Sequence, residues 1–174
     1  EAGLQPLADM LLDNPMLEPE AEAAAFINSE AQITTLKEAL DGAKQILMER
    51  FSQAADLLEE LREKAWQSAQ WQVSVIAGQE QAGAKFQDYF EFQEAFKTLP
   101  SHRTLAILRG RNEGILLAQV VWSDAGHEPF EGRVGSYWQI SNQGRPGDKW
   151  LQEVITWTWR IKLASQLETA LISR

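Results

Sequence analysis

Apolar residues in the first part of the chain recur every three or four positions, the spacing of one face of an α-helix. The clearest stripe consists of Ile33, Leu36, Leu40, Ala43, Leu47 and Phe51. Ser52 interrupts it, and a second stripe follows at Ala54, Leu58, Leu61 and Ala65. The pattern predicts two antiparallel helices joined by a short connection over residues 33–67, a pair of the helix-turn-helix kind. Shorter helices are expected over residues 4–13 and from Pro19 to Asn28.

The spacing changes near residue 70. Trp71, Val73 and Val75 alternate with polar residues, which predicts a short strand. The run from Ile115 to Val121 is apolar on both faces and predicts a buried strand that pairs with the first. Residues 123–135 are expected to form a loop, followed by a short helical piece over residues 137–140.

Aromatic residues gather between the two predicted strands, at Phe86, Tyr89, Phe90, Phe92 and Phe96. Aromatic side chains beside a basic segment can stack nucleobases. Four of these five also fit one helical stripe, and we interpret the cluster as core.

The last predicted element is one long helix from Lys149 to about Ile172, with Asp148 as its cap. Trp157 and Trp159 lie near Arg160 and Lys162, an arrangement that also suits a cationic, aromatic surface. We expect Trp157 to pack in the core. For Trp159, packing in the core and a place on a nucleic-acid-binding surface remain equal alternatives.

The predicted fold class is mainly α: multihelical, with a helix-turn-helix-like pair, a small two-strand β element and a long C-terminal helix. We expect N-terminal helices over residues 1–32, a helix-turn-helix-like subdomain over 33–77 and a central helical region with the long helix over 78–174. Because the first residue is Glu1 and not methionine, we expect a compact piece of a longer protein.

Charge is distributed unevenly along the chain. The formal net charge is −9. Residues 1–60 carry thirteen acidic and three basic side chains, whereas the remainder is close to balanced. The exposed side of the second predicted helix carries Asp56, Glu59, Glu60 and Glu63. A helix that acidic is repelled by phosphate, so a structural or protein-contacting role is favoured over DNA recognition for this pair.

One segment reverses the local sign. No acidic residue occurs between Ala95 and Asn112, and the cations and histidine of this window are Lys97, His102, Arg103, Arg109 and Arg111. A helix is expected from Ser101, acting as the N-cap, to Gly110, acting as the terminating glycine. Leu105 and Leu108 are expected to anchor it. We hypothesise that these five residues contact a polyanion; a solvated basic face with internal ion pairs is the alternative.

The residues argue against catalysis and bound cofactors. The chain has no cysteine and two histidines, so neither a thiolate site nor a histidine-rich metal site can be assembled. The sequence contains no GxSxG turn and no GxxxxGK[ST] loop. We expect no catalytic residue, no metal and no cofactor. No apolar run approaches the ~20 residues of a membrane helix, and no signal peptide is evident, so a cytoplasmic location is expected.

Four longer motifs resemble one family. They are GAKQILMERF at residues 42–51, AGAKFQDYF at 82–90, PSHRTLAILRGRNEGIL at 100–116 and DKWLQEVITWTWRIKLASQLETAL at 148–171. In this order they are similar to bacterial Tex proteins, which are cytoplasmic transcription accessory factors. The resemblance implies the N-terminal and central helical region, upstream of the resolvase-like, helix-hairpin-helix and S1 domains.

The resemblance also sets expectations for partners. In the family the downstream domains, S1 above all, are the main nucleic-acid contacts. It therefore implies RNA or DNA binding more firmly for the parent protein than for this region. His102, Arg103, Arg109 and Arg111 match the family motif. Residues 79–82 and Gln87 depart from it, because basic charge beside the aromatic cluster is lost.

Two functions remain open from the sequence. The first is a non-catalytic helical scaffold that supports nucleic-acid binding during transcription. The alternative is a protein-interaction module, in which the acidic first half docks on transcription machinery or on downstream domains of the parent protein.

Overall fold

The computed structural model describes residues 3–122 and 129–173. These residues form a mainly helical chain with eight α-helices and one three-stranded antiparallel sheet. The chain divides into two compact units. Unit 1 is the described part of Glu1–Leu58 with Phe130–Ser165, and unit 2 is the described part of Glu59–Pro129 with Gln166–Arg174. Each unit therefore combines segments that are distant in the sequence.

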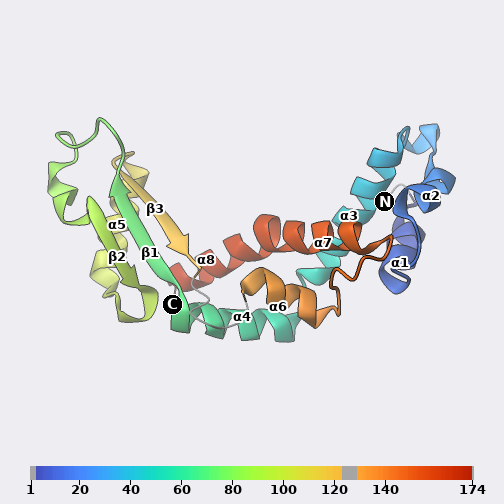
Figure 1. The fold of residues 1–174 in the computed structure, drawn as a ribbon. Helices are drawn as coiled ribbons and strands as arrows, with labels where there is room; N and C mark the ends of the chain where they lie inside the picture. The colour runs from blue at the N-terminus through green and yellow to red at the C-terminus, as the bar shows by residue number, and fades with distance from the viewer. Residues whose placement is uncertain (1–2, 123–128, 174) are drawn as a thin grey trace. The chain divides into compact units, whose positions relative to one another are not determined.

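Unit 1 is mainly helical. Its α-helices are α1 (Gln5–Asp13), α2 (Pro19–Ala23), α3 (Leu36–Phe51), α6 (Phe130–Tyr137) and α7 (Asp148–Trp157). Two short 3₁₀ turns follow α2, η1 (Ala24–Phe26) and η2 (Ser29–Ala31). Helix α3 packs against α1, α2 and α7 (Figure 1).

The start of α3 is determined by local hydrogen bonds. The Thr35 hydroxyl accepts from the Glu38 backbone N–H at 3.1 Å, and the Glu38 carboxylate accepts from the Thr34 backbone N–H at 3.1 Å. This arrangement is close to a capping box. Ile33, which the apolar stripe includes, therefore lies before the helix.

The buried stripe of α3 is Ala39, Ala43, Leu47 and Phe51. Leu36 and Leu40, also predicted to face the core, are only half-buried. The α3 helix itself and its apolar face are as predicted, but the first two turns leave their leucines partly accessible.

The predicted long C-terminal helix is present. Helix α7, a π-helical stretch η5 (Thr158–Leu163) and α8 (Ala164–Ser173) follow one another without a break. At the junction the Thr158 hydroxyl donates to the Val154 carbonyl at 2.8 Å. Trp159 is buried and stacks on Phe130 with ring centroids 5.2 Å apart, so it belongs to the core of unit 1.

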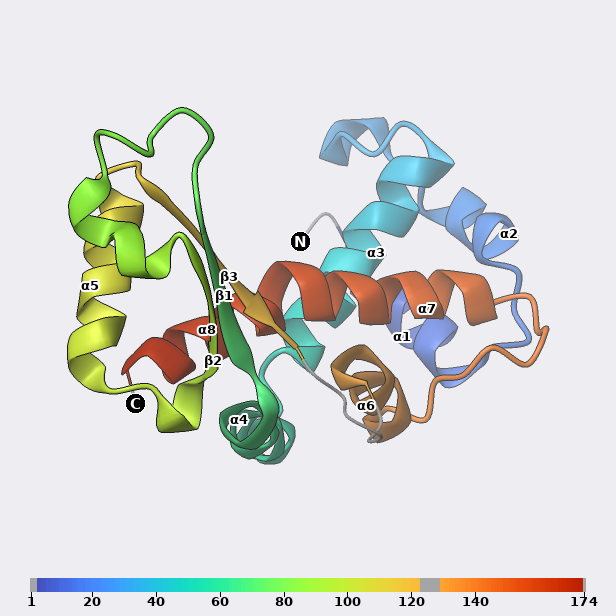
Figure 2. The ribbon, with the colours of Figure 1, turned by 60° about the vertical axis from the view of Figure 1, so that its left-hand side comes forward.

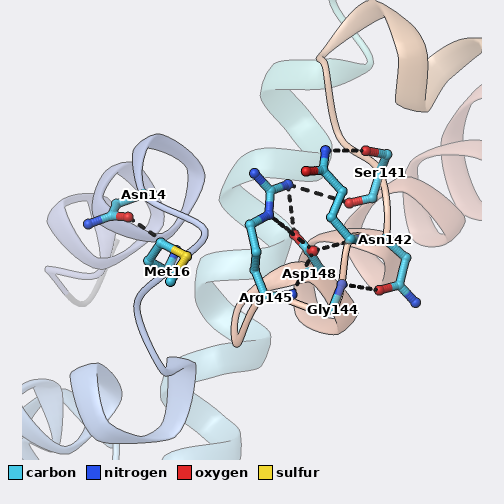
Figure 3. Close-up of polar contacts among 8 residues, drawn as sticks. Asn14, Met16, Ser141, Asn142, Gly144, Arg145 and Asp148 are labelled. Carbon is cyan, nitrogen blue, oxygen red and sulfur yellow. Dashed lines mark hydrogen bonds and ion pairs between the residues drawn. The ribbon is translucent and has the colours of Figure 1, made fainter.

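A short loop before α7 is organised by one buried carboxylate (Figure 3). Asp148 accepts hydrogen bonds from the backbone N–H groups of Gln143 at 2.7 Å and Arg145 at 3.0 Å, and it pairs with the Arg145 guanidinium. These donors, the arginine first, lower the pKa of Asp148. The N-cap of α7 is Gly147, whereas Asp148 was predicted from the sequence. Asp148 is the first helical residue, and its side chain accepts hydrogen bonds from the preceding loop.

The same loop is tied to the connection between α1 and α2. The Gly147 backbone N–H donates to the Pro15 carbonyl at 2.8 Å. A Cβ at Gly147 would lie 3.0 Å from that oxygen, so the two backbones approach closely only because residue 147 is glycine. Segments of unit 1 more than 120 residues apart in sequence meet there.

Helix α4 (Ala55–Ser68) begins in unit 1 and continues into unit 2. Leu57, Leu61 and Ala65 are its buried positions. The helix and its short connection to α3 are as predicted. Within unit 1, α3 packs against α1, α2, α7 and η5. A helix-turn-helix role for the pair stays a prediction.

Unit 2 contains the sheet, with strand order β2-β1-β3. The strands are β1 (Gln70–Val75), β2 (Glu91–Ala95) and β3 (Leu116–Val121), and both pairings are antiparallel. The predicted pairing of the first and last strands is confirmed. Val73 lies opposite Phe92 on one side and Ala118 on the other.

The predicted two-strand element therefore has a third strand. Strand β2 lies in the aromatic segment, whose spacing also fits a helical stripe. A 3₁₀ turn, η3 (Ala84–Tyr89), leads into the strand, and a second, η4 (Phe96–Thr98), follows it. Phe86 and Phe96 are buried, as expected for core, and Phe96 stacks on Trp71 at 5.1 Å. Residues 91–95 are extended because pairing with β1 satisfies their backbone and overrides the helical spacing.

The sheet has one apolar and one polar face. Trp71, Val73, Leu116 and Ala118 are buried on one side, which α5 (Ser101–Asn112) covers through its contacts with β3 (Figure 2). Gln72, Gln93 and Gln119 lie opposite one another on the other side. This alternation explains the period-two pattern of β1.

Two further predictions are corrected. Residues 130–137 form α6 rather than loop, because Phe130 and Val134, one turn apart, are both buried; the remaining loop prediction, 123–128, falls outside the described residues. Helix α2 ends at Ala23 and does not continue to Asn28. No helix among residues 3–122 and 129–173 has both the length and the apolar character to cross a membrane.

Candidate nucleic-acid interface

The basic segment forms η4 and helix α5 of unit 2. Pro100 is extended, with φ −62° and ψ 145°, and its carbonyl accepts from the backbone N–H groups of Arg103 and Thr104. Ser101 is the first helical residue and makes no capping hydrogen bond through its side chain, so the predicted N-cap is corrected to Pro100. The backbone N–H groups in the first turn of α5 therefore have no side-chain acceptor from a capping residue.

The end of α5 is set by Gly114 rather than Gly110. Gly114 has φ +76°, its backbone N–H donates to the Arg111 carbonyl at 3.1 Å, and the Ile115 N–H donates to the Gly110 carbonyl at 2.9 Å. This pair of bonds is a Schellman motif, in which a glycine adopts the left-handed conformation just past the helix. The predicted termination at Gly110 is therefore wrong.

Gly110 has a different role, in packing. A Cβ at this position would lie 2.4 Å from Leu116 Cδ1 and 3.3 Å from Phe86 Cδ1. The helix can therefore approach β3 closely only without a side chain there. Ile107, fully buried one turn earlier, is the second contact of this face.

The anchor of α5 consequently differs from the predicted one. Leu105 is 67% exposed, and Leu108 is half-buried. With Ile107 and Gly110 against the sheet, the opposite face of the helix presents Leu105 with His102 one turn before it and Arg109 one turn after it. Both His102 and Arg109 are exposed. We call Leu105, His102 and Arg109 the outer face of α5.

Two of the predicted cations lie on the flanks of α5 and contact other parts of unit 2. The Arg111 guanidinium is 3.4 Å from the Glu168 carboxylate of α8, and each side chain is 36% exposed. The Arg103 guanidinium lies 5.9 Å from the centre of the Phe92 ring, within the range of a cation–π contact. These arginines help to hold α5 in place and are only partly available to a ligand.

The remaining predicted residue, Lys97, is exposed in η4, and its ammonium donates to the Gln67 side-chain carbonyl at 3.0 Å. Within the described residues, no carboxylate pairs with Lys97, His102, Arg103 or Arg109. The structure thus brings the five candidates into one helix and the turn before it. It separates them into an accessible set, Lys97, His102 and Arg109, and a partly engaged set, Arg103 and Arg111.

Sequence reasoning missed the partners of these cations. Lys85, in the turn η3, forms an ion pair with Glu113 at 3.2 Å near the end of α5. Glu168 is 57 positions from Arg111, and nothing in the local pattern connects the two. Such contacts follow from the packing of α8 and η3 around α5, which no spacing rule encodes.

The basic segment presents charged and hydrogen-bonding side chains rather than a cluster of metal ligands. Among the residues that the structure describes, no three His, Asp or Glu side chains are grouped as a metal site would require. The available chemistry is that of hydrogen-bond donors and positive charge, which suits phosphate oxygens.

Comparison with known proteins agrees with these motifs. The family model described as Tex central region-like matches residues 14–174. Over the whole of this chain, the sequence is 42% identical to Protein tex of Bordetella pertussis. Over 99% of this chain, it is 42% identical to Protein YhgF of Escherichia coli. It is 39% identical to the Transcriptional accessory protein Tex of Neisseria gonorrhoeae over its full length. In each case it spans 23% of the relative. The chain belongs to the Tex central region-like family.

Proposed function

We propose that this chain is a non-catalytic helical scaffold of a Tex-like transcription accessory protein, and that α5 adds phosphate contacts when the whole protein engages RNA or DNA. The role belongs to the cytoplasm, where bacterial transcription takes place. Other parts of the parent protein supply most of the affinity. The relative from Neisseria gonorrhoeae is named a transcriptional accessory protein, which supports the setting of this proposal.

The observation that carries the proposal is the outer face of α5. In an acidic chain it holds His102 and Arg109 at the surface without a carboxylate partner among the described residues. The two side chains are seven positions apart, roughly 10 Å along the helix axis. They are therefore able to reach separate phosphates of one strand.

The helix dipole supports a role for Arg103, which lies in the first turn of α5, where no acidic residue is present. A cation at this positive end costs about 0.3–1 kcal/mol in an exposed helix. Helix stability alone therefore disfavours this arginine, and an anionic ligand would offset the unfavourable interaction.

The proposal is tested in the full-length protein by replacing single cations with glutamine. Removal of one phosphate contact should reduce the slope of log K against log salt by about 0.7 for single strands and about 0.9 for duplex DNA. We expect Arg109→Gln to show this reduction with unchanged sequence preference. We expect Arg111→Gln to show a smaller one, because its guanidinium is partly engaged by Glu168.

Arg62→Gln is the matched control, since Arg62 is an exposed arginine of unit 2 outside the basic segment. Equal salt slopes for the wild type, Arg109→Gln and Arg62→Gln would refute the contact assignment. Cleavage of RNA or DNA by the purified chain would refute the non-catalytic role.

A further inference from the structure

A groove of about 610 Å³ opens in unit 1, far in sequence from α5. The start of α2, the first turns of α3 and the start of α7 form its walls. Its volume lies within the range of specific ligand sites. All lining residues belong to unit 1, so the groove is independent of the role proposed for the outer face of α5.

The floor of the groove is apolar. Leu36 and Leu40, one turn apart on α3, are half-buried, and Trp150 of α7 is 5% exposed. The indole N–H of Trp150 is buried and has no acceptor among the described residues. Two leucines in this position on a helix form the kind of surface that receives apolar anchors from a second helix.

Lys44 also lines the groove, and its charge is already paired. The ammonium of Lys44 is 2.8 Å from the Glu153 carboxylate and 3.8 Å from that of Asp41, and it lies 4.7 Å from the centre of the Trp157 ring. Because Lys44 is buried between these two carboxylates, its charge is neutralised within the fold. Lys37 is paired with Asp41 at 2.6 Å.

The lining charges without an ion-pair partner in the described part of the chain are exposed, and we call Glu18, Glu20 and Lys149 the rim of the groove. Within the described residues, neither Glu18 nor Glu20 has an ion-pair partner, and both are exposed at the start of α2. Lys149, which is also exposed and lines the groove, has no ion-pair partner among the described residues either. Unit 1 also contains most of the acidic first sixty residues. Four carboxylates and three lysines line the groove, and this balance favours a cationic partner over nucleic acid.

We propose that this groove docks a basic amphipathic helix of a partner protein. Apolar side chains of the partner pack on Leu36 and Leu40, beside the buried Trp150, and its lysine or arginine side chains pair with Glu18 and Glu20. Rim charges of this kind speed association and select partners more than they add affinity. The groove is thus a place where the acidic part of the chain acts as a protein-docking surface.

The test uses the purified chain and synthetic peptides of defined chemistry. A fluorescent leucine–lysine amphipathic helical peptide is the probe, and a leucine–glutamate peptide of the same pattern is its control. Binding is measured by anisotropy, and the groove is located by the indole N–H resonance of Trp150, assigned with Trp150→Phe. We expect the basic peptide to shift that resonance and to leave the indole resonance of Trp71 in unit 2 unchanged.

Variants separate a groove from general attraction to an acidic protein. Glu18→Lys/Glu20→Lys should weaken binding of the basic peptide about fivefold to tenfold. Glu30→Lys/Glu59→Lys changes the net charge equally at exposed positions outside the groove and should weaken it less than about twofold. Leu36→Ser should also weaken binding, and circular dichroism establishes that each variant is folded.

Three results would overturn the proposal. One is an equal loss of affinity for the two charge-reversal variants, which indicates non-specific attraction. The second is equal binding of the leucine–glutamate peptide. The third is a shift of the Trp150 indole resonance by oligouridine, which would assign the groove to nucleic acid.

Discussion

Truncation of Ile107 and of Leu105 tests which face of α5 packs against the sheet. The two residues are two positions apart on the same helix, and they differ in environment: Ile107 is fully buried, whereas Leu105 is 67% exposed. The apolar pattern of the segment alone selects Leu105 and Leu108 as the anchor. The structure assigns the contact to Ile107 and Gly110.

The expected cost follows from the buried area. Ile107→Ala removes three buried carbon atoms, worth about 2.4 kcal/mol at ~0.8 kcal/mol for each buried methylene. The cavity left between α5 and β3 adds to this, because measured losses for such truncations are about 2–5 kcal/mol. Leu105 has only about a third of its surface covered, so the same truncation should lose less than about 1 kcal/mol. The higher helix propensity of alanine offsets part of that loss.

Urea unfolding followed by circular dichroism and tryptophan fluorescence measures both changes. Because the chain has two units, hydrogen exchange of the amides in α5 and β3 assigns the loss to unit 2. We expect Ile107→Ala to lower the unfolding free energy of these amides by about 3–4 kcal/mol and Leu105→Ala to change it by less than about 0.5 kcal/mol. A larger loss for Leu105→Ala would mean that α5 is rotated, so that His102, Leu105 and Arg109 would not form its outer face.

Two further predictions concern close packing and pH. Gly110→Val places branched carbon atoms against Leu116 and should lower the unfolding free energy by about 1–3 kcal/mol more than Ala106→Val does. Ala106→Val is the control, because it introduces valine at a half-buried position of the same helix. Equal urea midpoints for the two variants would contradict the close approach of α5 to β3. Asp148 has a lowered pKa in the folded state, so its contribution to stability is complete above the ordinary aspartate pKa of about 4 and is lost as pH falls through the lower folded value. Asp148→Asn should destabilise unit 1 at neutral pH and weaken the loss of stability below about pH 4, measured by thermal melts across that range. The exposed Asp13→Asn serves as the control, and an acid limb unchanged by Asp148→Asn would show that the loop does not depend on its charge.

The sequence by itself determined the elements whose cause is local. The stripe from Leu36 to Phe51, the proline that starts α2 and the long apolar face after Asp148 each correspond to an observed helix. The alternation at Trp71, Val73 and Val75 likewise corresponds to β1. In these segments propensity, periodicity and punctuation point the same way, so neighbours in sequence suffice. The composition of the basic segment and the motifs that identify the family are also properties of the chain alone.

Tertiary structure decided the elements whose cause is distant. The aromatic segment has spacings compatible with a helix, and it becomes β2 because β1 supplies backbone partners about twenty positions earlier. The rotation of α5 depends on the missing side chain of Gly110 against Leu116, which no hydrophobic pattern contains. That rotation buries Ile107 and brings Arg111 to Glu168. It leaves His102, Leu105 and Arg109 accessible, so the outer face of α5 is visible only once the chain is folded.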